Sequence, residues 1–244
     1  MIYKHTDFQV PDFGELTHPP REALGYRDAL LSRSPEAYWP MGEASETLLG
    51  DLAGGHTLAL SGEYTLGQGP ASPSADDGAV RLFNGKAQAA GAVLPTADDA
   101  AFSLVFWIRR RVPYAAGRFM SQYADGVPGR TSVTLRGDGR LRLSVLGDTV
   151  FHSTIAPVDQ WTHAVLARDD SGNACWYVNG ELDTTITGQS RAVADVPFIL
   201  GLNEESPIDV ELDEVAVFHA ALSSAEVAWL YRVAIDQPVP ALEG

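Results

Sequence analysis

The sequence predicts an all-β fold in which two antiparallel sheets pack face to face as a sandwich. The 244 residues include 23 glycines and 15 prolines, which suits many short strands joined by turns better than a helical protein. From Glu36 onward, strand patterns recur about every 8–12 residues, a spacing typical of β-sandwiches. Aspartate-glycine and asparagine-glycine pairs, which favour hairpin turns, separate several of these patterns. The length fits one large all-β domain or two small ones.

The first 34 residues differ from the rest and predict an extended arm followed by a short helix. Residues 7–14 contain turn residues and isolated aromatic side chains without a hydrophobic period. Thr17 is a suitable N-cap, Pro19 suits the first helical turn, and the Ser34-Pro35 pair ends the helix. Two interpretations remain open: a mobile terminus, or an arm that docks on a partner, which we favour.

Four patterns define the expected strands and hairpins. Residues 79–83 and 102–108 are rich in apolar and β-branched side chains and predict strands. Residues 135–141 predict a hairpin with an aspartate-glycine turn, and residues 176–182 predict another around Asn179-Gly180. Hairpins of this kind join antiparallel neighbours, so the sheets are expected to be antiparallel.

One helix closes the expected domain near the C-terminus. Ser223 and Glu226 have the spacing of a capping box, in which each side chain bonds the backbone N–H of the other residue. Val227, Leu230 and Tyr231 follow on one helical face. The helix is therefore expected to be amphipathic.

The composition excludes several classes of protein. The 32 acidic and 17 basic residues give a net charge of −15, which repels phosphate backbones, so we expect no nucleic-acid partner. No run of about 18 apolar residues occurs, so we expect no membrane-spanning helix. The single cysteine excludes an intrachain disulfide framework and a cysteine-based zinc site. The first residues lack the apolar core and cleavage site of a secretory signal peptide.

Five groups of residues resemble the motifs of laminin-G-like domains of the concanavalin A-like superfamily, in the order of that family. They are residues 38–43 with 51–55, residues 102–108, residues 161–165 with 176–181, residues 198–201, and residues 213–218 with 222–226. The resemblance covers residues 35–234 and implies a concanavalin A-like jelly roll. It divides the chain into the arm at 1–34, the jelly roll at 35–234 and a tail at 235–244.

A catalytic pair of carboxylates is the feature that would indicate an enzyme. Jelly-roll glycoside hydrolases carry E-x-D-x-E on one strand, and retaining hydrolysis needs two carboxyl groups about 5–5.5 Å apart. The nearest match places Glu211 and Asp213 on one face, but Val215 occupies the third position. Glu214 is expected on the opposite face of the strand. We therefore expect no enzymatic activity.

The resemblance implies calcium as a candidate cofactor, because members of this superfamily often hold Ca²⁺ with loop carboxylates and carbonyls. Glu43, Asp51, Asp213 and Glu214 are the candidate ligands, and Ca²⁺ takes about six to eight oxygen ligands. The alternative interpretation is that Asp51 caps its own turn and that Asp213 accepts backbone hydrogen bonds.

The longest predicted loop, residues 112–130, is the candidate region for carbohydrate binding, because the sites of related lectins lie in variable loops. Tyr114, Arg118 and Tyr123 are the candidate ligand-binding residues. Tyrosines at loop tips can stack on sugar rings. The alternative is that these tyrosines fill the end of the sandwich.

We expect a non-catalytic structural or binding module of a phage or phage-like virion. Bacterial domains of this family usually belong to exported proteins with signal peptides, whereas a virion component reaches the outside by lysis. The expected partners are other virion proteins bound through residues 1–34, with self-association and a host-surface glycan as further candidates. The alternative is a free-standing, extracellular lectin-like protein, and a glycan hydrolase is the least favoured interpretation.

Overall fold

The computed structural model describes residues 24–72, 78–113, 116–127, 129–145, 149–188, 190, 194–201 and 208–236. Its elements, in chain order, are α1 (Tyr26–Leu31), β1 (Ala37–Trp39), β2 (Leu48–Leu49), β3 (Leu58–Gln68), β4 (Ala79–Gln88), β5 (Phe102–Arg110), β6 (Gly117–Gln122), β7 (Thr131–Leu135), β8 (Arg140–Val145), β9 (Thr149–Ile155), β10 (Thr162–Arg168), β11 (Ala174–Val178), β12 (Glu181–Ile186), β13 (Phe198–Gly201), β14 (Asp209–Phe218) and α2 (Ser224–Ala234). Among the described helices, none is long and apolar enough to cross a membrane.

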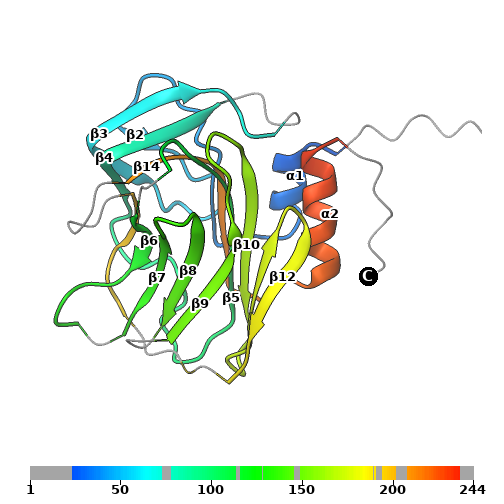
Figure 1. The fold of residues 1–244 in the computed structure, drawn as a ribbon. Coiled ribbons are helices and arrows are strands. Elements are labelled where there is room, and N and C mark those ends of the chain that lie inside the picture. Colours follow the sequence, from blue (N-terminus) through cyan, green and yellow to red (C-terminus); the bar gives the residue numbers. More distant parts are fainter. Residues whose placement is uncertain are drawn as a thin grey trace, which may run out of the picture.

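The strands form one antiparallel path that folds over into two layers. The order is β12-β11-β10-β5-β14-β4-β13-β6-β7-β8-β9, with β1 beside β14 and β3 beside β2 and β4. Strand β14 pairs with β5 and β4, and β13 pairs with β4 and β6, so β4 and β13 connect the two layers. Figure 1 shows β6 to β9 as one layer and β5 with β10 as the next. The predicted all-β, jelly-roll-like architecture is confirmed, with its two sheets joined into one continuous path.

The main hydrophobic core lies between these two layers. Phe106 of β5 packs edge-on against Phe119 of β6 and Trp176 of β11, with ring centroids 5.7 and 6.5 Å apart. Trp39 of β1 stacks on Phe198 of β13 at 5.7 Å. Aromatic pairs in these arrangements add to the stabilisation that burial of apolar area provides.

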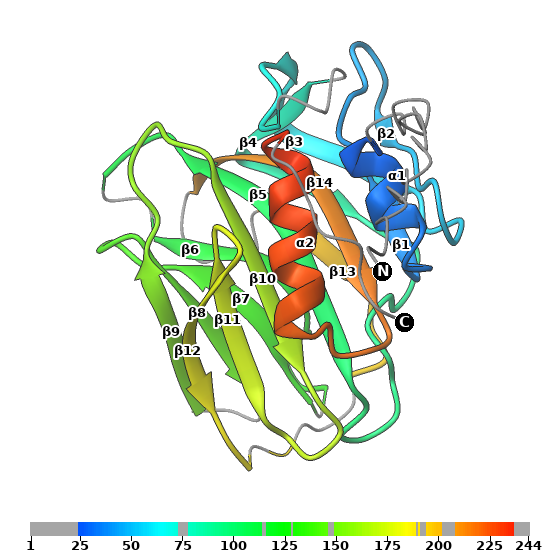
Figure 2. The same cartoon turned by 90° about the vertical axis from the view of Figure 1, so that its right-hand side faces the viewer.

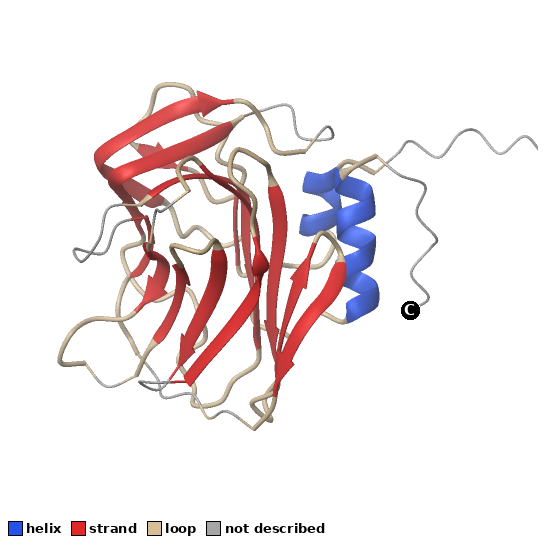
Figure 3. Ribbon diagram, viewed as in Figure 1, coloured by secondary structure: helices blue, strands red, loops and turns tan. Residues whose placement is uncertain are grey.

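Figure 2 shows the helices on the other side of the β5–β10–β14 layer. A second hydrophobic core lies between them and the sheet. Tyr26 and Leu30 of α1 and Val227 and Leu230 of α2 are all fully buried there. Both helices lie on this one side of the sandwich (Figure 3). Because β5 has a core on each face, nearly all of its side chains are buried. That double burial explains the continuous apolar run that predicted a strand at 102–108.

Helix α1 packs onto the sandwich. The sequence predicts residues 1–34 as an extended arm with a short helix, ahead of the jelly roll. Residues 26–31 form a helix whose Tyr26, Ala29 and Leu30 are part of the second core. The apolar side chains of α1 therefore belong to the domain itself. The arm residues 1–23 lie outside the described residues.

The local turn and cap signals are confirmed. Asn179 and Gly180 both have positive φ, 51° and 80°, as a type I′ turn requires, and they join β11 to β12. Ser223 and Glu226 form the predicted capping box at the start of α2, with both reciprocal hydrogen bonds present.

Candidate functional site

The face of β6, β7 and β8 that points away from the core is polar. Val133 and Leu135 of β7 and Leu141 and Leu143 of β8 all point into the main core. Side chains alternate along a strand, so the intervening residues face the other way. These intervening residues are arginines, serines and a threonine rather than apolar side chains.

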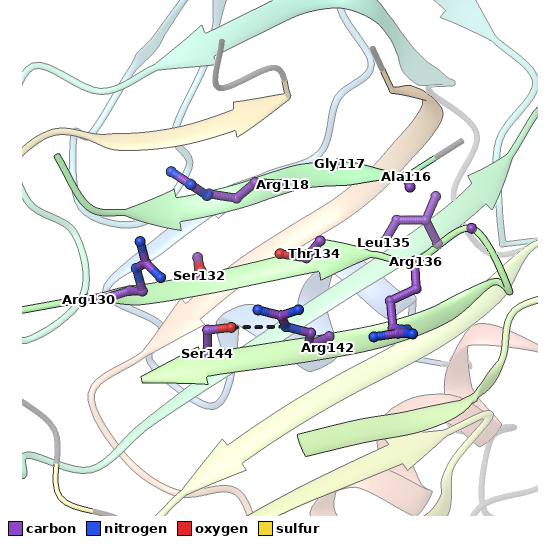
Figure 4. A pocket seen from close by; sticks show the side chains of 11 residues that line it. Ala116, Gly117, Arg118, Arg130, Ser132, Thr134, Leu135, Arg136, Arg142 and Ser144 are labelled. Atoms are coloured by element: carbon purple, nitrogen blue, oxygen red, sulfur yellow. Dashed lines mark hydrogen bonds between the residues drawn. The ribbon is translucent and has the colours of Figure 1, made fainter. Parts of the chain in front are cut away.

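This outward face carries an open pocket of about 450 Å³. Figure 4 shows that its floor is formed by the three neighbouring strands, whose polar side chains project toward the viewer. The lining residues are Ala116, Gly117, Arg118, Arg130, Ser132, Thr134, Leu135, Arg136, Gly137, Arg142 and Ser144. We call this the arginine pocket.

The strand register sets the spacing of the side chains in the arginine pocket. Arg118 on β6 pairs with Thr134 on β7, which pairs in turn with Arg142 on β8. Neighbouring strands lie about 4.8 Å apart, so the backbones at Arg118 and Arg142 are about 10 Å apart. Ser132 and Ser144 form the next row across the sheet. The Nε of Arg142 donates a hydrogen bond of 3.2 Å to Ser144 Oγ.

Tyr123 holds two guanidinium groups at one end of the pocket. The Cζ of Arg118 lies 4.7 Å from the centre of the Tyr123 ring, and the Cζ of Arg130 lies 4.2 Å from it. The negative face of an aromatic ring attracts a cation at such distances. The Tyr123 hydroxyl donates to the carboxylate of Asp125. These contacts orient both guanidinium groups against the face of the ring.

The structure brings together two of the three predicted ligand-binding residues. Arg118 lines the arginine pocket and contacts Tyr123, whereas Tyr114 lies outside the described residues. Sequence reasoning missed Arg130 and Arg142. The signal that could have found them is a period of two, with Arg-x-Ser-x-Thr-x-Arg at 130–136 and Arg-x-Arg-x-Ser at 140–144 on the two sides of a hairpin turn.

Asp51, a predicted calcium ligand, is engaged by backbone groups. Its carboxylate accepts hydrogen bonds from the N–H groups of Tyr38, Ala53, Gly54 and His56 at 2.7–3.1 Å. Burial opposes the ionisation of Asp51, but these hydrogen bonds together outweigh it and lower its pKa. The contacts match the alternative in which Asp51 caps its own turn.

The other expected ligands occupy separate surroundings. The Glu43 carboxylate accepts a hydrogen bond of 2.6 Å from the N–H of Gly50 at the surface, while Asp213 and Glu214 are fully buried on β14. Within the described ranges, no group of three or more His, Cys, Asp or Glu side chains is arranged to hold a metal ion. The structure therefore does not assemble the four predicted carboxylates into one site.

A β-bulge corrects the expected orientation of Asp213 and Glu214. The pairing of β14 with β5 shifts in this region, and Glu214 has a φ of 51°. Asp213 accepts a hydrogen bond of 2.7 Å from the N–H of Ala71, and Glu214 accepts one from the Tyr38 hydroxyl. Tyr38 belongs to the second core, and the partly buried Ala71 packs against it. The prediction of opposite faces was wrong, because the extra residue of the bulge turns both carboxylates toward the helices.

Glu211 forms ion pairs with two arginines. The Nε of Arg109 lies 2.6 Å from one of its carboxylate oxygens, and the Nε of Arg111 lies 3.3 Å from the other. Only 1% of Glu211 is exposed, and Asp213 is fully buried. The two carboxylates that the sequence placed on one face therefore do not line an open cleft.

The chain is thus a jelly-roll-like sandwich with a polar, open sheet face. Residues 83–228 match the family model described as the concanavalin A-like lectin/glucanases superfamily. The chain belongs to this superfamily. No curated protein matches the sequence.

Solved structures that are similar in fold include binding domains of bacterial toxins. The binding domain of Paraclostridial Mosquitocidal Protein 1 has a TM-score of 0.60 and 16% identity, over 80% of this chain and 51% of that one. A structure of botulinum neurotoxin type C, reported with its dependence on two ganglioside molecules for cell entry, has a TM-score of 0.61 and 15% identity, over 83% of this chain and 52% of that one. The chain thus spans about half the length of these structures.

Proposed function

We propose that this chain is a non-catalytic carbohydrate-binding module that recognises a glycan on a cell surface through the arginine pocket. The observation that carries the proposal is the pocket itself, an open site on a lectin-type sheet. It is lined by guanidinium and hydroxyl groups that can donate hydrogen bonds to sugar oxygens. The toxin domains of the same fold support it, because cell entry of botulinum neurotoxin type C depends on interaction with two ganglioside molecules.

A binding role also agrees with the ion pairs and hydrogen bonds that the buried carboxylates form. Glu211 is paired with Arg109 and Arg111, and Glu214 accepts a hydrogen bond from Tyr38. A retaining glycosidase instead needs two carboxyl groups that face the substrate across a short gap. We therefore place ligand recognition, rather than hydrolysis, at the centre of the proposed function.

A panel of immobilised neutral and acidic oligosaccharides tests this proposal. We expect the full chain to be retained on at least one glycan, and the soluble form of that glycan to compete. The double variant Arg130→Gln/Arg142→Gln should lose this retention. If no oligosaccharide in the panel retains the chain, the carbohydrate-binding function is wrong.

We further propose a phage or phage-like virion as the setting, with extracellular display as the alternative. Because Tyr26 and Leu30 are buried in the chain's own second core, attachment to another virion protein would fall to residues before 24. Light scattering on the full chain and on a chain lacking residues 1–23 tests this attachment. An oligomer that becomes a monomer on truncation supports it, and two monomers argue against self-association through these residues.

A further inference from the structure

The arginine pocket has the opposite charge to the protein around it. The whole chain carries a net charge of −15, yet four of the residues that line the pocket are arginines. None of the described lining residues is acidic. A concentrated positive potential in a concave site raises the local concentration of anions. This contrast indicates a ligand with negative charge.

Elsewhere in the described chain, Arg81 and Arg168 are paired with carboxylates, and of the pocket arginines Arg136 has its Nε 3.6 Å from the carboxylate of Asp138. Arg81 forms two hydrogen bonds of 2.7 and 2.8 Å with Asp209, and Arg168 bonds Asp99 at 2.7 Å. In the pocket, Arg130 contacts the ring of Tyr123 and Arg142 bonds a serine hydroxyl. Neither of these partners carries a negative charge, so an incoming anion can supply one.

The charges extend along the sheet instead of meeting at one point. Arg130 and Arg136 directly flank β7 and both line the pocket; they are six positions apart, which corresponds to about 20 Å of extended chain. Ser132 and Thr134 lie between them and also line the pocket. An elongated ligand can therefore place anionic groups on the arginines and a hydroxyl group on the half-buried Thr134, while Ser132 is almost fully buried.

We propose that the pocket binds an acidic oligosaccharide that carries more than one sulfate or carboxylate group. This inference rests on the proposed carbohydrate-binding function and specifies its ligand class. Guanidinium groups form paired, charge-assisted hydrogen bonds with both kinds of anion. A nucleic acid also carries many anionic groups, but the net charge of −15 repels a long phosphate backbone that extends beyond the pocket.

Calorimetric titration of the full chain with three hexasaccharides tests the ligand class. The probes are sulfated chondroitin, unsulfated chondroitin, which carries carboxylates only, and chitin hexasaccharide, which is neutral. We expect the acidic probes to bind at least about tenfold more tightly than the neutral one. The two chondroitins then distinguish sulfate from carboxylate as the preferred anion. A higher salt concentration should weaken the binding of the acidic probes and leave the binding of the neutral probe unchanged.

Matched variants locate the binding. Arg130→Gln/Arg142→Gln should weaken the acidic probes about tenfold or more, whereas Arg130→Lys/Arg142→Lys should retain part of the affinity because it keeps both charges. Arg232→Gln, an exposed position on α2, removes one positive charge elsewhere and should leave the affinity unchanged. Equal melting temperatures among the variants show that each is folded.

The possible results separate the two proposals. Equal affinity for neutral and acidic hexasaccharides overturns the acidic ligand and leaves carbohydrate binding intact. No binding to any of the three, together with no retention on the glycan panel, overturns both. Single-stranded DNA of matched charge that binds as tightly as sulfated chondroitin overturns the inference in favour of a general polyanion site. If Arg130→Gln/Arg142→Gln binds the acidic hexasaccharides as tightly as the wild type does, the arginine pocket is not the binding site.

Discussion

Beneath helix α1, the hydroxyl of Tyr38 donates a hydrogen bond to the carboxylate of Glu214, and neither side chain is exposed to solvent. Burial raises the pKa of Tyr38, and the neighbouring Glu214 raises it further. The tyrosine therefore stays neutral and remains a donor over the whole physiological range. A buried carboxylate depends on such donors, because its lost hydration must be replaced.

Removal of this donor should destabilise the protein. We expect Tyr38→Phe to lower the free energy of unfolding by about 1–3 kcal/mol, because Glu214 loses one buried hydrogen bond. Urea denaturation measures this change. Tyr64→Phe, at a half-buried position on β3, is the control and should cost less than about 0.5 kcal/mol. Equal losses in the two variants would show that the Tyr38–Glu214 contact contributes nothing specific.

His163 should make the stability depend on pH. Burial lowers its pKa to about 3, and the Tyr26 hydroxyl lies 2.9 Å from its Nε2. The unfolded chain, with an ordinary histidine pKa near 6.5, binds a proton that the folded chain does not. The contribution of neutral, buried His163 to the free energy of unfolding is therefore fully present above pH 6.5. It is lost as the pH falls from 6.5 toward 3. We expect it to remove about 2 kcal/mol by pH 5.

The slope of the unfolding free energy between pH 7 and pH 5 measures this effect. His163→Gln should flatten the slope, because glutamine does not titrate in this range. A slope that His163→Gln does not change would assign the pH dependence to other groups.

Gly180 should tolerate no side chain. It has a φ of 80°, and a Cβ atom there would lie 2.8 Å from the side chain of Tyr231 on α2. We expect Gly180→Ala to cost about 2–4 kcal/mol, because backbone strain and a steric clash add. Gly188 has a φ of 67° but open space around it. Gly188→Ala should therefore cost only about 1–2 kcal/mol, and the difference in melting temperature between the two variants measures the contact with α2.

Local signals predicted much of the fold, because turns and caps depend on neighbouring residues. The capping box at Ser223 and Glu226 and the turn at Asn179-Gly180 are formed by residues close in sequence. The strand at 102–108 was also recognisable, since burial on both faces leaves an unbroken apolar run.

Features that depend on distant contacts could not be predicted in the same way. The bulge at Glu214 follows from its packing under Tyr38, which is 176 positions away in the chain. Helix α1 joins the domain because Tyr26 reaches His163. The arginine pocket could be predicted only in part. The alternation of Arg130, Ser132 and Thr134 is present in the sequence, but only the pairing of β7 with β6 places Arg118 beside them.

Asp51 provides a test of the calcium expectation. Its two carboxylate oxygens already accept hydrogen bonds from four backbone N–H groups, so Asp51→Asn should lower the free energy of unfolding by about 1–3 kcal/mol. For the same reason, we expect EDTA to leave the melting temperature of the wild type unchanged. A lower melting temperature in EDTA that excess Ca²⁺ restores would instead show that calcium stabilises the folded chain.

The ring of Tyr123 should support ligand binding by orienting Arg118 and Arg130. Tyr123→Phe removes the hydroxyl that bonds Asp125 but keeps the ring face on which both guanidinium groups lie. We therefore expect Tyr123→Phe to bind sulfated chondroitin hexasaccharide as the wild type does. Tyr123→Ala removes the ring and should weaken binding about fivefold, in line with the strength of exposed cation–π contacts.

Calorimetry of the two variants separates the ring from the hydroxyl. Tyr64→Ala, on β3, truncates a tyrosine outside the arginine pocket and should leave the affinity unchanged. If Tyr123→Phe weakens binding as much as Tyr123→Ala does, the hydroxyl and its bond to Asp125 position the site. If neither variant weakens it, the arginines keep their positions without the ring, because the strand register alone then holds Arg118 opposite Thr134.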